Sequence, residues 1–532
     1  MTKALALALL LAGPASTEVV THLLINWSRV DAGDTVFPVD QTKITPENRE
    51  IIEKVKDYYS IRLSEGPSAP ERVNAPANVR LRPEMARKTA PFLTGDKPWE
   101  TAGVAAGSLL HENGKFRFWY SCSYAGRDKV IVAPNGRLKL GTEGGGGGMC
   151  YAESTDGFHW TKPPLGLVEF EGSKQNNIVS SHPLVSGGLS SIFVDPLAPP
   201  GEKYKLMTMA SMSSIKPDSK VRGSVLAGAS SPDGIHWTPF SEPLLAESFN
   251  NDGTPSVSYD PKLRRYVGYF RMNYPRRRSI GRAETEDFRR WPLPRLILTP
   301  TIDEDPSNDF YTNPYFQYPG AENGHLMLVS IYHRDLSTVD MRLASSMDGI
   351  AWNWLGKEAI VPLGAKGEWD GGSLYAGSNM VLLADGRAAI PFTGQSWGHN
   401  EWWRVKYESD YPKRSGIGWA VWENGRVAGI ESGQQGEFTT LPLKFSGGPI
   451  EVNVRTGFSG SARVDLIPDK EPPIPSRQIV GDHLWTAVRW QDDPDISKVK
   501  GKTVRLRFRL YDAKVFGFRG EGLESVSSYN IK

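Results

Sequence analysis

The stretch Ser154-Thr155-Asp156-Gly157-Phe158-His159-Trp160 decides the fold, because it returns three more times along the chain. Ser231–Trp237 repeats it closely, Thr285–Trp291 repeats it with Phe288 in place of the glycine, and Ser346–Trp352 is the fourth copy. Each copy has a hydroxyl residue two positions before its Asp and a Trp four positions after it. The copies are unequally spaced, so a constant unit is separated by loops of variable length. Such recurrence is typical of propellers, solenoids and arrays.

Short strands separated by turn residues surround each copy. The first unit begins with the predicted strands Ala105–Glu112 and Lys115–Cys122 around Asn113-Gly114, a strong hairpin signal. The same pattern of two hairpins follows four more times, and in the last unit the third strand, Gly416–Val421, leads to the turn Asn424-Gly425. Five four-stranded meanders with almost no helix predict an all-β fold with a five-bladed β-propeller. The repeated Asp and Trp fall on the turn between the third and fourth strands, where Asp can accept backbone N–H bonds and Trp can pack between blades.

The chain outside the repeats divides into further parts. Residues 1–18 resemble a signal peptide, with Lys3, an apolar stretch and then small residues, which predicts a secreted or periplasmic protein. Residues 19–78 form an N-terminal extension expected to pack on the propeller, with one helical candidate at Pro46–Tyr59. The propeller is expected over 79–430. Residues 431–532 alternate between strands and Gly or Pro turns, which favours a C-terminal antiparallel β-sandwich.

Composition excludes some functions. The chain has 62 Lys and Arg against 60 Asp and Glu, and this balance argues against a nucleic-acid partner. No apolar run beyond the N-terminus approaches the roughly 20 residues of a membrane span. The two cysteines, Cys122 and Cys150, border neighbouring predicted strands. The sequence is compatible with either a disulfide between them or two buried thiols. The arginine run at 276–278 is interpreted as a solvated face, with attraction of an anionic polysaccharide as the alternative.

Candidate site residues follow from the geometry of a propeller, in which the starts of the innermost strands and the ends of the second strands meet around the axis. The predicted catalytic acids there are Glu100, Asp252 and Asp370, with Asp309 in reserve. The predicted substrate-binding residues are Arg271, Tyr311, His333, Trp397 and His399. Crowded carboxylates push their pKa values apart, which suits an acid and a base or nucleophile in glycoside hydrolysis. Alternatively, some of these acids hydrogen-bond loop backbones and only line the rim.

The chain resembles the five-bladed propeller glycoside hydrolases of the invertase and inulinase type (family 32) and the arabinanase type (family 43). It is most similar to secreted invertase-like proteins with a C-terminal β-sandwich. The stretches that carry the resemblance are Pro98-Trp99-Glu100, Ser154–Trp160 with Asn176–Val179, Asn251-Asp252-Gly253, Trp369-Asp370-Gly371 and Gly416-Ile417-Gly418. Lys97–Glu100 departs from the Trp-x-Asn-Asp-Pro-Asn-Gly stretch of invertases, and their Glu-Cys pair has no match. Fructan specificity is therefore not implied.

We expect a secreted glycoside hydrolase that cleaves a neutral or anionic poly- or oligosaccharide with paired carboxylates in the funnel. No cofactor or catalytic metal is implied, although a structural calcium ion in the propeller is left open. One alternative is a glycan-binding propeller without catalysis, favoured if fewer than two carboxylates lie close together in the funnel. Another is a phosphorylase, which would need a cluster of Arg, Lys or His there. The sugar, the linkage and the oligomeric state are left open.

Overall fold

The computed structural model describes residues 18–56, 59–132, 138–185, 190–220, 223–245, 253–273, 276–321, 323–401 and 413–526. The predicted signal peptide therefore lies outside the described residues, except for its last position. Strands dominate, and the described part contains two α-helices, α1 (Pro46–Val55) and α2 (Met212–Ile215). The chain divides into two compact units. One comprises Pro83–Pro319 and Asn323–Val427, and the other comprises Met1–Arg82, Gly320–Glu322 and Ala428–Lys532.

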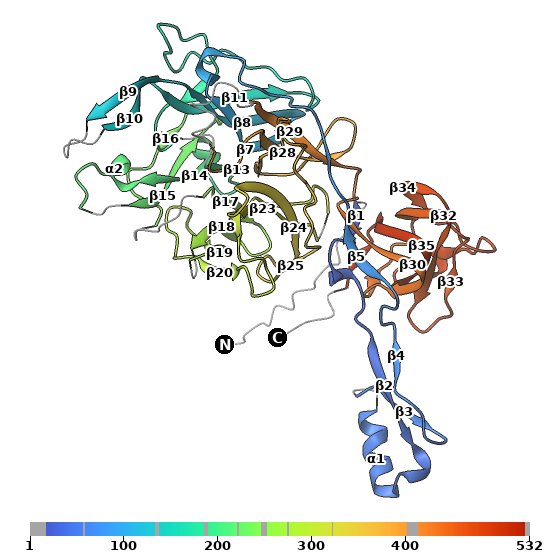
Figure 1. Ribbon diagram of the computed structural model, residues 1–532. Helices are drawn as coiled ribbons and strands as arrows, with labels where there is room; N and C mark the ends of the chain where they lie inside the picture. The colour runs from blue at the N-terminus through green and yellow to red at the C-terminus, as the bar shows by residue number, and fades with distance from the viewer. Residues whose placement is uncertain are drawn as a thin grey trace, which may run out of the picture. The chain divides into compact units, whose positions relative to one another are not determined.

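The first unit is the predicted five-bladed β-propeller, and its first three blades are four-stranded antiparallel sheets (Figure 1). Blade one consists of β7 (Gly103–Glu112), β8 (Lys115–Tyr124), β11 (Gly146–Ser154) and β12 (Ile178–Ser180), with the hairpin β9 (Arg127–Val132) and β10 (Leu138–Glu143) inserted. Blade two consists of β13 (Ser190–Val194), β14 (Tyr204–Ser211), β15 (Ser224–Ser231) and β16 (Thr238–Pro239). Blade three consists of β17 (Ser256–Asp260), β18 (Arg265–Asn273), β19 (Arg278–Thr285) and β20 (Arg295–Leu298).

Blades four and five have interrupted innermost strands. Blade four consists of β21 (Asn308–Thr312) and β22 (Tyr315–Gln317), then β23 (His325–His333), β24 (Thr338–Ser346) and β25 (Trp352–Trp354). Blade five consists of β26 (Ser373–Ala376) and β27 (Val381–Leu382), then β28 (Ala388–Gln395) and β29 (Ser415–Trp422). Its fourth strand is β6 (Arg87–Lys88), which pairs with β29 through Lys88 and Ala420. We expected that strand to follow Asn424-Gly425; instead, the segment before blade one closes the ring and covers the edge of β29.

The repeated stretch forms the turn predicted for it. Asp156 Oδ1 accepts the backbone N–H groups of Phe158 (2.7 Å) and His159 (2.8 Å), while Gly157 N–H donates to Ser154 Oγ (2.9 Å). The copies at Asp233 and Asp348 make the same bonds. The expected role of the Asp as a turn acceptor is therefore confirmed.

The glycine of this turn also joins neighbouring blades. The carbonyl of Gly157 accepts Trp419 Nε1–H of blade five at 3.0 Å. The carbonyls of Gly234 and Gly349 likewise accept from an aromatic donor in the preceding blade, Trp119 Nε1 (2.7 Å) and Tyr269 Oη (2.9 Å). In the third copy, which has Phe288 in place of the glycine, apolar packing joins the neighbouring blades instead of a hydrogen bond.

That copy has Phe288, whose ring lies 5.5 Å from the ring of Phe193 in blade two, within an apolar cluster that includes Met207. Apolar contact replaces the hydrogen bond at this one junction. The repeated stretch thus fastens blade to blade, by a hydrogen bond in three copies and by packing in the fourth.

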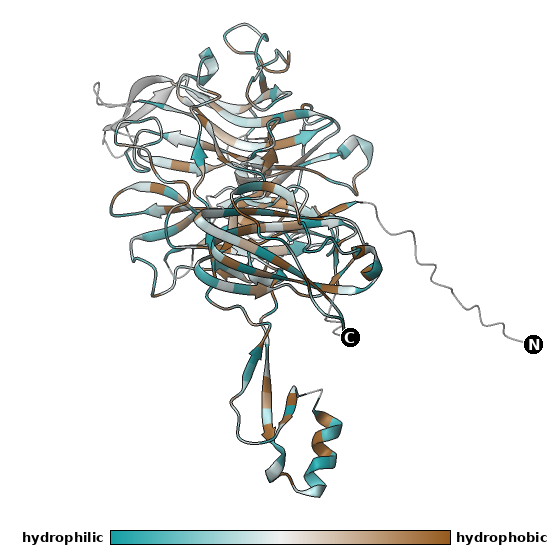
Figure 2. Ribbon diagram, turned by 90° about the vertical axis from the view of Figure 1, so that its right-hand side faces the viewer, coloured by the Kyte–Doolittle hydropathy of each residue, from teal (hydrophilic) through white to brown (hydrophobic). Residues whose placement is uncertain are grey.

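The second unit contains the predicted β-sandwich. Its nine-stranded sheet consists of β1 (Val19–Leu23), β5 (Arg80–Pro83), β30 (Ala428–Thr439), β31 (Leu443–Lys444), β32 (Ile450–Pro468), β33 (Ile474–Pro475), β34 (Asp482–Ala487), β35 (Thr503–Glu521) and β36 (Glu524–Ser525). The pairing of β32 with β35 shifts register between Thr456 and Ser461, and such a bulge bends a sheet. Figure 2 shows hydrophobic and hydrophilic residues alternating along these strands. The hydrophobic residues form one core, in which Phe438 stacks on Phe508 at 4.8 Å.

We expected the N-terminal extension to pack on the propeller; instead, it belongs to this second unit. Strand β1 pairs along β35 from Val19, opposite Glu521, to Leu23. A separate small sheet of β2 (Asp34–Asp40), β3 (Ile61–Ser64) and β4 (Glu71–Val73) accompanies α1. The predicted helix is present but ends at Val55, and Thr45 caps it by accepting Asn48 N–H at 3.3 Å.

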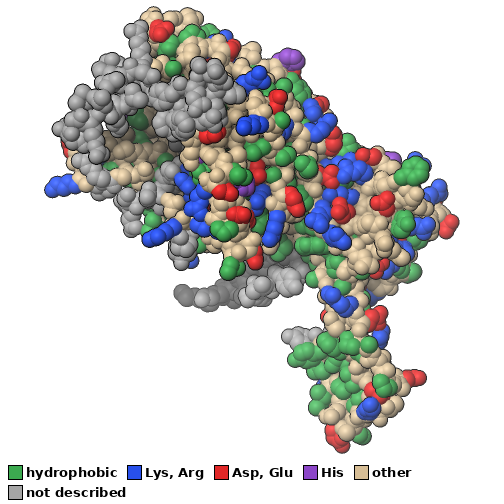
Figure 3. All heavy atoms as spheres, viewed as in Figure 1, with side chains coloured by type: hydrophobic (Ala, Val, Ile, Leu, Met, Phe, Trp, Pro, Cys, Tyr) green, Lys and Arg blue, Asp and Glu red, His purple; other side chains and the backbone are tan. Residues whose placement is uncertain are grey.

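Two further features of the structure are the state of its cysteines and the distribution of charge on its surface. Cys122 on β8 and Cys150 on β11 form a disulfide with their Cα atoms 5.8 Å apart, so of the two open alternatives the bridge is present. Figure 3 shows acidic and basic side chains interspersed over the face in view. No helix among the described residues is long and apolar enough to cross a membrane.

Candidate functional site

The candidate site lies at the end of the propeller axis where the innermost strands begin. Tyr311 lies on β21 and Tyr375 on β26, the innermost strands of blades four and five. Arg271 lies near the end of β18, and His399 follows the end of β28. Below them, residues of blades one, three, four and five line a central cavity of only about 20 Å³.

Tyr311 is the centre of a cationic and aromatic cluster. The guanidinium carbon of Arg271 lies 4.2 Å from the centre of its ring, and that of Arg278 lies 5.0 Å from it. The rings that surround Tyr311 are those of His399 (4.6 Å), Tyr332 (5.6 Å) and Tyr375 (6.2 Å). We call these six residues the axis-mouth cluster. Cation–π contacts of this kind stabilise the arginine positions by roughly 0.5–2 kcal/mol each.

A tyrosine and a histidine of the cluster are hydrogen-bonded to each other. Tyr375 Oη lies 2.7 Å from His399 Nδ1. Burial raises the pKa of Tyr375 far above its usual value, so the phenol keeps its proton at neutral pH. As the donor, it directs the hydrogen of a neutral His399 to Nε2. The pair can therefore orient hydroxyl groups of a ligand.

Asp309 is the predicted carboxylate that touches the cluster. It is 1% exposed, its Oδ2 lies 2.9 Å from Arg278 Nη1, and its Oδ1 accepts the backbone N–H of Arg278 at 3.1 Å. Arg334 Nε lies 3.9 Å from the same carboxylate. Arg278 and Arg334 thus both face the carboxylate of Asp309.

Glu100 lies in a buried network inside blade one. The side chain is 1% exposed, and its carboxylate binds Lys162 Nζ (2.6 Å) and Tyr120 Oη (2.7 Å) as well as two backbone N–H groups. Burial, together with the charge of Glu100, raises the pKa of Tyr120 well above its usual value. Asn177 donates to Tyr120 Oη and accepts from Trp99 Nε1. Several residues that carry the family resemblance are therefore parts of this internal network.

Asp370 is tied to the strand that closes the ring. It is 5% exposed, and its Oδ2 lies 2.6 Å from Lys88 Nζ of β6. Lys88 also donates to the carbonyl of Pro362. No hydrogen bond or ion pair in the described ranges links Glu100, Asp309 and Asp370 to one another. Asp252 lies outside the described residues.

The remaining predicted residues lie around β21 and β26. Both ring nitrogens of His333 are engaged inside blade four, Nδ1 with Asn308 Oδ1 (2.6 Å) and Nε2 with Asp340 Oδ2 (3.0 Å). The backbone carbonyl of Trp397 accepts Ser373 Oγ–H at 2.9 Å, which holds the loop after β28 against β26. Of the five predicted substrate-binding residues, Arg271, Tyr311 and His399 are brought together.

Sequence reasoning missed Arg278, Tyr332 and Tyr375. Arg278 was hidden in a run of arginines interpreted as a solvated face, although it opens β19 next to the axis. Tyr375 lies two residues into β26, where counting from the strand start would have found it. Among the described residues no three His, Cys, Asp or Glu side chains gather that could hold a metal ion.

No known family model matches the chain, and no curated protein matches it. Several solved structures are similar to it at low identity. One is an N-acetylgalactosamine deacetylase from F. plautii, at 13% identity over 67% of this chain and 95% of that one, with a TM-score of 0.39. Another is a β-1,2-mannobiose phosphorylase from Listeria innocua, at 14% over 66% and 98%, with a TM-score of 0.43.

A third is an α-L-arabinofuranosidase from Podospora anserina, at 14% identity over 64% of this chain and 98% of that one, with a TM-score of 0.39. These neighbours are carbohydrate-active proteins, the kind that the sequence resembles. With TM-scores below 0.5, the similarity carries no conclusion about the activity of this chain. The activity has to be argued from the site itself.

Proposed function

We propose that the protein is a secreted carbohydrate-active enzyme of the glycosidase type that binds an acidic glycan at the axis-mouth cluster. The observation that carries this proposal is the position of Arg271 and Arg278 over the ring of Tyr311, at 4.2 and 5.0 Å. Guanidinium groups bind carboxylate, sulfate and phosphate oxygens through paired hydrogen bonds. Aromatic rings beside them suit the apolar face of a sugar ring. The predicted signal peptide supports secretion.

Glycosidic hydrolysis needs an acid that protonates the leaving oxygen and a carboxylate that attacks the anomeric carbon or activates water. We assign one of these roles to Asp309, which shares Arg278 with the cluster. We assign the other to Asp252, which directly precedes Gly253 in the sequence. A side chain at Gly253 would come within 2.6 Å of Arg271 Nε, so Gly253 itself lies against the cluster. Glu100 and Asp370 take structural roles, since their ion pairs with Lys162 and Lys88 involve no residue of the axis-mouth cluster.

Phosphorolysis is a second candidate, favoured by the same arginines. A phosphate oxygen would attack the anomeric carbon while an acid protonates the leaving glycosidic oxygen, which yields a sugar phosphate. The predicted condition for this reaction, a group of Arg, Lys or His in the funnel, matches Arg271, Arg278 and His399. Arg271 would then hold inorganic phosphate rather than an acidic group of the glycan.

The test is a product assay on purified protein. Neutral, uronate-containing and sulfated polysaccharides are incubated with and without inorganic phosphate, and new reducing ends and sugar phosphates are quantified. Reducing ends from acidic glycans without phosphate support hydrolysis, and products that require phosphate support phosphorolysis. Binding without any product would indicate a glycan-binding propeller instead.

Variants connect the product to the cluster. Arg271→Met should abolish turnover of acidic glycans. Arg295→Met is the matched control, because Arg295 is an exposed residue of β20, the outer strand of the same blade. Equal turnover of neutral and acidic glycans, unchanged by Arg271→Met, would contradict the proposal.

A further inference from the structure

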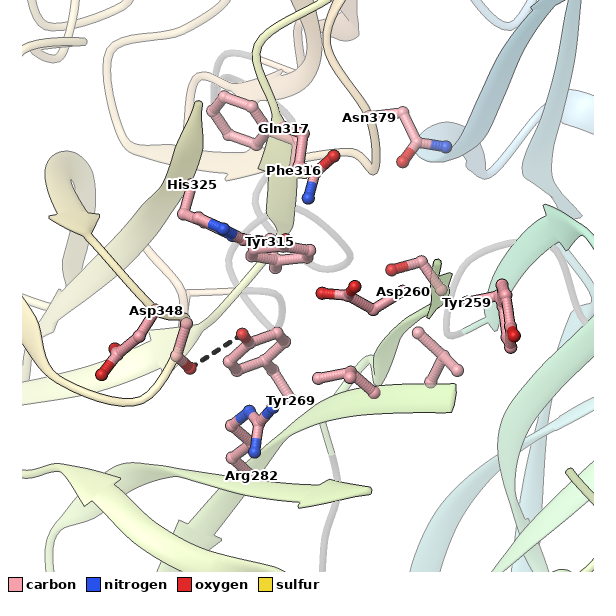
Figure 4. Close-up of a pocket in the computed structure, with 14 residues that line it drawn as sticks. Tyr259, Asp260, Tyr269, Arg282, Tyr315, Phe316, Gln317, His325, Asp348 and Asn379 are labelled. Atoms are coloured by element: carbon pink, nitrogen blue, oxygen red, sulfur yellow. Dashed lines mark hydrogen bonds between the residues drawn. The ribbon is translucent and has the colours of Figure 1, made fainter. Parts of the chain in front are cut away.

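A polar pocket of about 150 Å³ lies at the other end of blades three and four (Figure 4). Asp260 marks this end, because it closes the turn from β17 to β18, whereas the axis-mouth cluster lies where β18 ends. Turn residues Asp348 and Gly349 of blade four and Asn379 of blade five complete the lining. A pocket of this size is suited to one sugar unit.

The floor of the pocket is a rigid aromatic stack. The rings of Tyr269 and Tyr315 lie 4.6 Å apart, and both side chains are buried. The hydroxyl of Tyr269 donates to the carbonyl of Gly349 at 2.9 Å, and that of Tyr315 lies 2.8 Å from His325 Nδ1. These bonds fix both rings, so the pocket is formed before a ligand arrives and little ordering would oppose binding.

Hydrogen-bonding groups point into this space. One oxygen of Asp260 accepts the backbone N–H groups of Lys262 (2.8 Å) and Leu263 (3.0 Å). Its carboxylate points between the two tyrosines (Figure 4), and no hydrogen bond within the described ranges engages its second oxygen or the hydroxyl of Ser258. The exposed amide of Gln317 lies at the rim.

Asn379 uses its amide N–H on the carbonyl of Leu109 at 2.8 Å, and this bond leaves its oxygen toward the pocket. A carboxylate, an amide and a hydroxyl beside an apolar wall are the groups that bind sugar hydroxyls and the C–H face of a sugar ring.

The charges around the pocket favour a neutral sugar. Asp260 and Asp348 both line it, and of the two cations that act on His325, Arg282 is paired with Glu284 at 3.0 Å and Lys262 follows the turn that Asp260 closes. An acidic sugar would be repelled by the two carboxylates. Burial lowers the pKa of His325, which therefore adds no positive charge at neutral pH. The axis-mouth cluster, by contrast, contains Arg271 and Arg278.

We propose that this pocket is a second glycan-binding site that holds one neutral sugar unit of a longer chain. This inference rests on the proposed function only in the choice of sugars as the ligand class. The two sites lie at opposite ends of blade three, so one sugar cannot occupy both. A polymer that reached both sites would be held more tightly than by either alone, because the second contact is intramolecular.

The test uses saturation-transfer NMR with free glucose, galactose, mannose, xylose, arabinose and glucuronate as probes. The pocket variant combines Asp260→Asn with Gln317→Ala. Asparagine keeps the oxygen that accepts the turn N–H groups, and Gln317 is exposed, so folding should be preserved and is checked by the unfolding midpoint. At least one neutral sugar should bind the wild type, and the variant should bind it about tenfold more weakly.

Arg271→Met separates this site from the axis-mouth cluster, and it should leave the neutral-sugar signal unchanged. If the protein proves to have no glycan turnover but this pattern holds, the pocket stands and the proposed function fails. Absence of any neutral-sugar signal, equal binding by the pocket variant, or a preference for glucuronate at the pocket would overturn the inference.

Discussion

Replacement of Gly234 by alanine tests how the blades are joined. Gly234 has φ of +77°, and its carbonyl accepts Trp119 Nε1–H at 2.7 Å. A side chain at this position would lie 2.7 Å from the Trp119 ring, so the ring has to move. The left-handed conformation costs alanine about 1–2 kcal/mol. Loss of the hydrogen bond adds about 0.5–1.5 kcal/mol. We therefore expect Gly234→Ala to lower the free energy of unfolding by about 1.5–3.5 kcal/mol.

Gly386→Ala is the matched control. Gly386 has φ of +82° in a turn of blade five, and no atom lies within 4 Å of an added side chain. In this variant the free energy of unfolding should fall only by the cost of the left-handed conformation, about 1–2 kcal/mol. Urea unfolding followed by tryptophan fluorescence measures both losses. Equal losses for the two variants would refute the idea that the repeated glycine fastens neighbouring blades.

Three further outcomes follow from the contacts. Lys162→Met leaves the Glu100 carboxylate buried without its cation and should cost about 3–5 kcal/mol of stability; a fully stable variant that loses only turnover would instead place Glu100 in catalysis. Cys122→Ala with Cys150→Ala opens a loop with a sequence separation of 28 and should cost about 3–4 kcal/mol, seen as a lower unfolding midpoint that matches the reduced wild type. Burial raises the pKa of Asp233, but hydrogen bonds from His236 and Ile235 outweigh it and hold the pKa at about 2, below the usual 3.8. The depressed pKa stabilises the fold above pH 3.8, and this contribution is lost as the pH falls towards 2, so unfolding midpoints should show the advantage of wild type over Asp233→Asn shrinking across that range.

The blades could be predicted from the sequence because their signal is local. The bonds of the repeated turn join residues within three positions of one another, such as Asp156 and His159. A short stretch therefore carries its own geometry wherever it recurs. The same holds for α1, whose cap Thr45 and first-turn Pro46 are adjacent in the sequence.

Long-range pairing could not be predicted in this way. Strand β6 has two residues and no pattern of its own, and its partner β29 begins more than 300 residues later. The sequence predicts the acids of the funnel only from their positions in the propeller. It does not predict the cations that pair with them. Lys162 pairs with Glu100 and Lys88 pairs with Asp370 from distant segments, and these pairs hold both acids away from the axis-mouth cluster. Arg278 is likewise placed in the site by long-range contacts, which it makes with Asp309 and Tyr311.

The central claim is that the axis-mouth cluster binds an acidic group. The most direct measurement is calorimetric titration of glucuronate, galacturonate, galactose sulfate and inorganic phosphate into wild type, Arg271→Met and the control Arg295→Met. We predict that at least one of these anions binds wild type and Arg295→Met alike, and binds Arg271→Met at least about tenfold more weakly. Equal affinity of all three proteins for every anion would contradict the account.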